Sequence, residues 1–172
     1  MIMTVVLMSG LISVRQDAWV RATTACGAAS LALAASVQAV DGVALKAIVD
    51  RWALAAPEDK PPLFAAALAV RQIEIGFDAL LGLAVGGTLV VFGFTLLAAT
   101  GTSRWQGMLA AVIGVASGVA GVLIGLGGYS SAAMLATTVS GGLAIVWMVT
   151  VGVWAWRLAP AASQAEAPVA AR

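Results

Sequence analysis

Residues 71–78 read RQIEIGFD, and the residues that follow, 79–100, read ALLGLAVGGTLVVFGFTLLAAT. The first stretch carries three charged side chains, whereas the second carries none. A helix needs about 20 consecutive apolar residues to cross the hydrocarbon core of a bilayer. The boundary between the two stretches therefore predicts the level at which a long helix leaves a membrane.

The composition of the whole chain agrees with a membrane setting. Of its 172 residues, 62% are hydrophobic and 10% are charged, and the mean hydropathy is +1.02. Soluble domains are about 25% charged, so we expect an integral membrane protein. A net charge of +1, without a basic stretch, argues against nucleic acid as a partner.

Several kinds of chemistry lack their usual residues. The chain has no histidine, which removes the commonest metal ligand and the usual general base. No spacing resembles a metal loop or a phosphate-binding loop. We therefore expect no catalytic residue, no metal, no cofactor and no enzyme activity. The single cysteine, Cys26, is expected to be a small packing residue.

The hydropathy pattern predicts an all-α polytopic bundle of transmembrane helices with four spans. The predicted spans are 22–40, 79–100, 105–126 and 138–156. The connector 41–78 joins the first two spans. In it, residues 43–56 place apolar side chains on one stripe, which predicts an extracytoplasmic amphipathic helix that lies on the membrane surface or caps the bundle. After the turn around residues 57–62, the long second helix is expected from Leu63.

The two ends of the chain are expected to lie outside the four-span domain, 22–157. Residues 1–21 form a lead-in whose apolar part, Met1–Val14, is short for a span. A surface-lying segment is the main interpretation, and a fifth, imperfect span is the alternative. Cleavage after Ala39, which follows a small-x-small pattern, is another. The tail 158–172 is rich in alanine and proline and is predicted to be disordered.

Basic residues predict the orientation. Five arginines fall on the side of the two termini: Arg15, Arg21, Arg104, Arg157 and Arg172. Most of them lie close to span ends, where the positive-inside rule has most force. We therefore expect both termini in the cytoplasm and residues 41–77 facing outward.

Three charged residues at the start of the second span share one helix face, because Arg71, Glu74 and Asp78 are separated by three and four positions. Together with Asp41 they form the candidate polar cluster. The favoured interpretation is a set of salt bridges at the interface, where charge is easily solvated. The alternative is a site that handles a proton, a cation or a ligand at the mouth of the bundle. Burial of Asp78 would favour this alternative.

Small residues predict close packing between helices. The third span carries a glycine face with steps of three and four: Gly107, Gly114, Gly118, Gly121 and Gly125. Such spacing lets two membrane helices approach closely. The face is expected to meet another helix of the chain, a second copy or another membrane protein. The first span has a similar face of small residues: Ala25, Ala29, Ala32 and Ser36.

Three segments of the chain resemble a known group of proteins. They are residues 39–46 (AVDGVALK), 49–53 (VDRWA) and 70–76 (VRQIEIG). Over about residues 22–158 the chain is similar to an uncharacterised family of small bacterial four-helix integral membrane proteins. This resemblance implies a span, a polar connector, a long second helix and two further spans in a bacterial inner membrane. It implies no catalytic or binding residue.

From the sequence we expect a structural or partner-binding membrane component. Its expected partners are the lipid bilayer and a second copy or another membrane protein at the glycine face. The alternative is a carrier or channel for a small solute or proton that uses the face of Arg71, Glu74 and Asp78. A third hypothesis, an enzyme acting on lipid, requires a pair of carboxylates in a buried pocket.

Overall fold

A computed structural model describes residues 18–98 and 104–166, and within them the side chains of residues 21–98 and 104–154. Residues 1–17 of the predicted lead-in, which include the segment Met1–Val14 and its alternative interpretation as a fifth span, lie outside the described residues. All regular structure in the described part is helical. The elements are α2 (Ala18–Ala39), η1 (Val40–Leu45), α3 (Lys46–Leu54), α4 (Lys60–Ala98), α5 (Arg104–Gly127) and α6 (Ser131–Glu166). Four helices are long and apolar enough to cross a membrane, as predicted.

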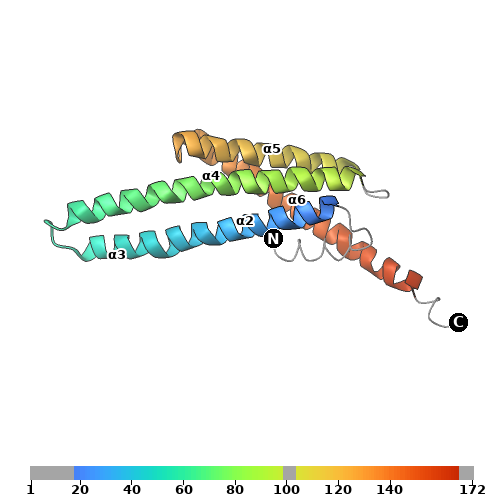
Figure 1. The fold of residues 1–172 in the computed structure, drawn as a ribbon, viewed down its shortest axis with the longest axis horizontal. Coiled ribbons are helices and arrows are strands. Elements are labelled where there is room, and N and C mark those ends of the chain that lie inside the picture. The colour runs from blue at the N-terminus through green and yellow to red at the C-terminus, as the bar shows by residue number, and fades with distance from the viewer. Residues whose placement is uncertain (1–17, 99–103, 167–172) are drawn as a thin grey trace.

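The first helix does not end at Asp41, which corrects the prediction of a separate amphipathic helix over 43–56. A six-residue π-helix, η1, joins α2 directly to α3, so the chain stays helical from Ala18 to Leu54. A π-helix accommodates an extra residue without breaking the helix. The α3 segment then runs along α4 instead of lying across the end of the bundle (Figure 1).

A tight turn joins α3 to α4. Ala55 adopts an extended conformation that ends α3, and α4 begins at Lys60, three positions before the predicted Leu63. The two prolines that follow Lys60 are tolerated there because the first turn of a helix needs no intrahelical N–H donor. We call α3 and residues 60–78 of α4 the hairpin.

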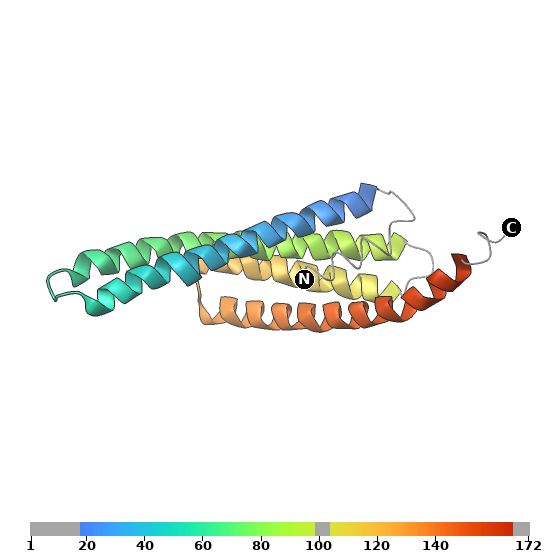
Figure 2. The same cartoon turned by 90° about the horizontal axis from the view of Figure 1, so that it is seen from below.

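The hairpin extends beyond the other helices. With a rise of about 1.5 Å per residue, α4 is about 58 Å long and α5 is about 36 Å long. The helices α5 and α6 meet at a level well short of the α3–α4 turn, as two perpendicular views show (Figures 1 and 2). The opposite end of the bundle holds the start of α2 and the end of α6.

Glycines hold α4 and α5 together along their length. A Cβ atom added at Gly86 would lie 2.6 Å from the carbonyl oxygen of Gly114, and one added at Gly93 would lie 2.6 Å from that of Gly107. At Gly82 it would lie 2.7 Å from the Cα atom of Gly121. The two backbones therefore touch, and no side chain fits between them. In a membrane such contacts supply the packing that draws helices together.

The buried core lies between α4, α5 and α6. It consists of Leu89, Phe92, Leu96, Ala110, Ile113, Ala144, Trp147 and Val151. Phe92 and Trp147 pack edge to face with ring centroids 5.5 Å apart. The indole N–H of Trp147 donates to the backbone carbonyl of Gln106 at 3.2 Å. This bond gives the large aromatic ring of α6 a polar partner on α5.

The last helix is longer at both ends than predicted. It begins at Ser131, whereas a loop was predicted up to Thr137, and it continues to Glu166, whereas disorder was predicted from Leu158. Alanine is frequent at both ends, and it has the highest helix propensity. The prediction of disorder is therefore wrong up to Glu166, and residues 167–172 lie outside the described part.

The contact of α2 with α4 uses a different face from the predicted one. Ala25, Ala29 and Ala32 are exposed. The buried Ser30 instead lies within hydrogen-bonding distance of Thr88, with 3.1 Å between their hydroxyl oxygens. Hydroxyl groups of this kind connect membrane helices at close range.

Candidate functional site

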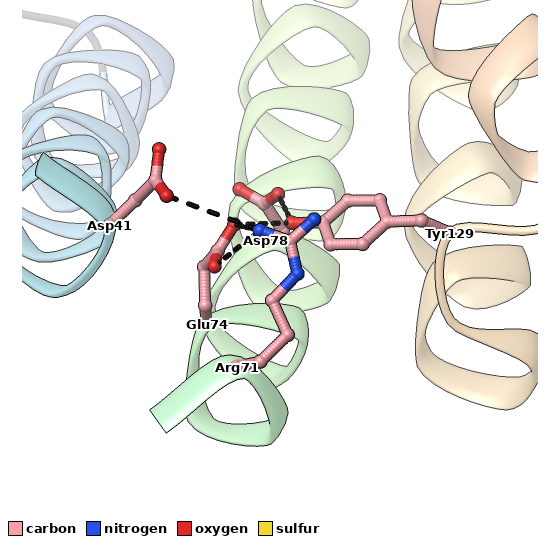
Figure 3. A network of polar contacts seen from close by, with 5 residues as sticks. All are labelled: Asp41, Arg71, Glu74, Asp78 and Tyr129. Atoms are coloured by element: carbon pink, nitrogen blue, oxygen red, sulfur yellow. Dashed lines mark hydrogen bonds and ion pairs between the residues drawn. The ribbon is translucent and has the colours of Figure 1, made fainter. Parts of the chain in front are cut away.

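The candidate site lies where the connection between α5 and α6 touches α4, at the base of the hairpin. Five side chains meet there: Asp41, Arg71, Glu74, Asp78 and Tyr129 (Figure 3). They come from η1, from two turns of α4 and from the α5–α6 connection. The structure thus brings together all four predicted cluster residues and adds a tyrosine.

A buried ion pair forms the centre of the cluster. The Nη1 atom of Arg71 donates to both carboxylate oxygens of Glu74, at 2.9 and 2.7 Å. Glu74 is 4% exposed, whereas the Arg71 side chain is 41% exposed. A carboxylate buried to this degree requires a charged or hydrogen-bonded partner. The expectation that charge here is easily solvated is therefore wrong for Glu74, whereas its predicted pairing with Arg71 is confirmed.

Tyr129 connects the last two helices to this pair. Its hydroxyl donates to Oε1 of Glu74 at 3.0 Å and also contacts Oδ2 of Asp78. The guanidinium carbon of Arg71 lies 4.5 Å from the centroid of the Tyr129 ring, which is a cation–π contact. Tyr129 is the only tyrosine of the chain. One side chain therefore meets all three cluster residues that α4 contributes.

The short connection between α5 and α6 positions Tyr129. Gly128 has a φ of +61° and its N–H donates to the carbonyl of Ile124 at 2.8 Å, which ends α5. The hydroxyl of Ser130 accepts from the N–H of Ala133 at 3.3 Å, which caps the start of α6. A glycine that ends a helix and a serine that begins the next are a sequence signal. This signal could have located Tyr129 in a tight turn beside the cluster.

The environment of Tyr129 keeps its hydroxyl protonated. Burial raises the pKa of Tyr129 above its ordinary value, and the hydrogen bonds and negative charges of Asp78 and Glu74 raise this pKa further. The hydroxyl has one proton and faces two carboxyl groups. A single hydroxyl hydrogen therefore lies between two acceptor groups.

Asp41 is the exposed member of the cluster. Its carboxylate lies 4.0 Å from Nη1 of Arg71, and its side chain is 51% exposed. Two cations on α3, Lys46 and Arg51, are exposed, and Lys46 pairs with Asp50 on the same helix. The cluster therefore holds three carboxyl groups and one guanidinium group, which lies against Glu74 and Asp41, whereas Asp78 contacts Tyr129. Ionised together, the three carboxyl groups leave an excess of negative charge.

The glycine face of α5 is covered by α4. Gly107, Gly114 and Gly121 lie against the backbone of α4, whereas a Cβ atom added at Gly118 would meet nothing within 4 Å. At Gly125 the nearest atom would be the Cβ atom of Ala79, at 3.4 Å. Of the three partners expected for this face, the structure places a helix of the same chain, α4, against it. An external partner would require another surface.

A second feature is an uncovered stripe on the hairpin. The residues of α4 that meet α5 or its end include Ile75, Ala79, Gly82 and Gly86, with steps of three and four. The same steps lead away from α5 to Arg71, Leu68 and Phe64. Leu68 is 48% exposed and Phe64 is 55% exposed. We call Phe64, Leu68 and Arg71 the hairpin stripe.

Comparisons with known proteins give no functional information, since no family model, curated protein sequence or solved structure matches the chain. The resemblance of residues 39–76 to small bacterial membrane proteins therefore stays a prediction. Within the described residues, no group of three or more histidine, cysteine, aspartate or glutamate side chains is arranged to hold a metal ion. The chemistry available at the site is hydrogen bonding, ion pairing and proton exchange.

Proposed function

We propose that the protein is a multi-pass component of a cell membrane that binds another protein through its hairpin. Four apolar helices support membrane insertion. Arg21 and Arg104 lie at the end of the bundle opposite the hairpin, which favours a cytoplasmic location for that end and for both termini. In this placement α5 and α6 cross the bilayer, and the hairpin stands in water on the other side.

The observation that carries the proposal is the exposure of Phe64 and Leu68 beyond the end of α5. They precede Ile75, which lies level with that end, by 11 and 7 positions, and these correspond to about 16 and 10 Å along the helix. In the proposed placement, both side chains stand outside the lipid tails that surround α5. Large apolar side chains aligned outside the lipid are typical of a surface that binds protein.

A copurification experiment from native membranes tests this function. We expect a partner at constant stoichiometry with the unaltered chain, and loss of that partner with the double substitution Phe64→Ser and Leu68→Ser. Ile73→Ser is the matched control, because Ile73 is 54% exposed on the same helix but away from the stripe. Purification of the unaltered chain alone, or retention of the partner by the double variant, would contradict the proposal.

A second candidate function is the transport of a proton or a small solute past the polar cluster. It is favoured by the single hydroxyl proton between Glu74 and Asp78. In reconstituted vesicles, Asp78→Asn should reduce proton flux, whereas Asp50→Asn, at the exposed ion pair on α3, should not. Equal flux in all three proteins excludes this function. Since Arg71 and Tyr129 already engage Glu74, an enzyme acting on lipid has less support.

A further inference from the structure

We propose that the hairpin stripe binds one amphipathic helix of another protein, about four turns long, with a lysine or arginine near the end that meets Asp41. This inference rests on the proposed partner-binding function and specifies the partner. It is carried by the continuity of the stripe with the α4–α5 interface, by the positions of the other candidate occupants and by the charge of the cluster.

The stripe continues an interface that already holds a helix. The α5 helix covers α4 from Gly93 to Ala79 and ends at Gly127, and the Cδ1 atom of Ile75 would lie 3.8 Å from a Cβ atom added at Gly128. Beyond this point Arg71 contacts Tyr129, Glu74 and Asp41, whereas the side chains of Leu68 and Phe64 are exposed. The remaining length of α4, residues 60–74, is about 22 Å and accommodates a helix of about 15 residues in line with α5.

The described ends of the chain lie far from the stripe. The described part begins at Ala18 and ends at Glu166, and both lie at the end of the bundle opposite the hairpin (Figure 2).

A second copy in the same membrane is also poorly placed. The helix α5 occupies this face of α4 from Ala79 to Gly93, so a neighbouring bundle has to stand on the far side of α5. Packed helix axes are about 8–10 Å apart, and two such steps place the neighbour's nearest helix about 16–20 Å from α4. A helix of a different protein, resting above the end of α5, meets the stripe directly.

The charge of the cluster specifies the polar end of that helix. The Nη1 atom of Arg71 donates to Glu74. The carboxylate of Asp41 lies 4.0 Å from the same atom, and about half of the Asp41 side chain is exposed. Among Asp41, Glu74 and Asp78, only Asp41 is exposed, since Asp78 is partly buried and Glu74 is buried. A cation on the incoming helix would find there an opposite charge at the foot of an apolar stripe.

Binding of synthetic peptides to the full chain in lipid nanodiscs tests the inference. Two fluorescent 15-residue helical peptides would share one leucine stripe and differ only in a terminal lysine or glutamate. We expect the lysine peptide to bind at least about fivefold more tightly. Leu68→Asp should abolish binding of both peptides, whereas Ile73→Asp should not, and empty nanodiscs measure binding to lipid.

A substitution of Asp41 tests the expected preference for the lysine peptide. Asp41→Asn should reduce the difference between the two peptides to less than about twofold and leave the affinity for the glutamate peptide unchanged. Equal binding of both peptides to the unaltered chain, or binding that Leu68→Asp leaves intact, overturns the inference. The proposed function survives that result if a native partner still depends on Phe64 and Leu68. Independence of the native partner from these residues rejects the function itself.

Discussion

The two halves of α4, residues 60–78 and 79–98, contact their neighbours through different kinds of side chain. Residues 79–98 present glycines, so that the backbones of α4 and α5 touch and hydrogen bonds are secondary. Residues 60–78 contact α3, η1 and the α5–α6 connection partly through charged and aromatic side chains. Close packing provides the contact where α5 runs alongside, and ion pairs provide it where α5 ends. The change occurs within one helical turn, between Asp78 and Gly82.

The largest expected effect on stability comes from a substitution in the glycine-packed half of α4, residues 79–98. Gly86→Ala places a methyl group 2.6 Å from a backbone oxygen of α5, so the helices must separate. We expect a loss of about 2–3 kcal/mol in the free energy of unfolding, measured by denaturant titration in detergent. The adjacent Gly87→Ala is the control, because its Cβ atom would meet nothing within 4 Å. Equal stability of the two variants would show that α4 and α5 are further apart.

A somewhat smaller effect is expected in the polar half. Arg71→Gln removes the guanidinium group and leaves the buried Glu74 with the hydroxyl of Tyr129 as its remaining polar partner among the contacts described here. We expect a loss of about 2 kcal/mol by the same titration. Lys46→Gln removes an exposed cation that pairs within α3 and should change stability by less than about 0.5 kcal/mol. A small effect of Arg71→Gln would mean that water reaches Glu74.

An alkaline titration of Tyr129 tests its contact with the polar half of α4. Since the folded pKa of Tyr129 is raised, the folded state holds its proton at pH values where the unfolded chain releases it. The resulting stability is present below pH about 10, the ordinary tyrosine pKa, and is lost as the pH rises further. Because Tyr129 is the only tyrosine, the ultraviolet absorbance of its phenolate reports this site alone. Tyr129→Phe should remove the absorbance change and flatten the decline in stability.

The smallest effect on stability is expected on the hairpin stripe. Leu68→Ala removes a half-exposed side chain and should change the free energy of unfolding by less than about 0.5 kcal/mol. Ile73→Ala should behave alike in the same measurement. The two variants should differ only in binding of a partner. A large loss of stability in Leu68→Ala would show that this side chain packs within the chain.

The sequence predicted the parts of the molecule that depend on residue type and spacing. The helix 104–127 was predicted to within one residue at each end, since a run without charge bounded by arginine and glycine has few alternatives. The pairing of Arg71 with Glu74 follows from their spacing on one helix. Both features are local, and local geometry is what helical periodicity specifies.

The remaining features depend on contacts between distant segments. The pair Asp41–Gly42 has the composition of a helix end, yet the chain continues as a π-helix beside α4. The exposed face of α2 has the same small residues as a packing face, and only the position of α4 distinguishes the two. Tyr129 reaches Glu74 across 55 positions of sequence. A spacing rule along one helix contains no information about such a contact.

The π-helix η1 has a consequence for how the length of this chain can vary. Its wider turn contains an additional residue between α2 and α3. Loss of one residue from 40–45 would return this segment to an ordinary α-helix, and α3 would keep the side that meets α4. The turn 55–59 also tolerates a change of length, because an added residue there lengthens only the loop. Single-residue deletions tolerated during evolution should therefore be found in 40–45 as well as in 55–59.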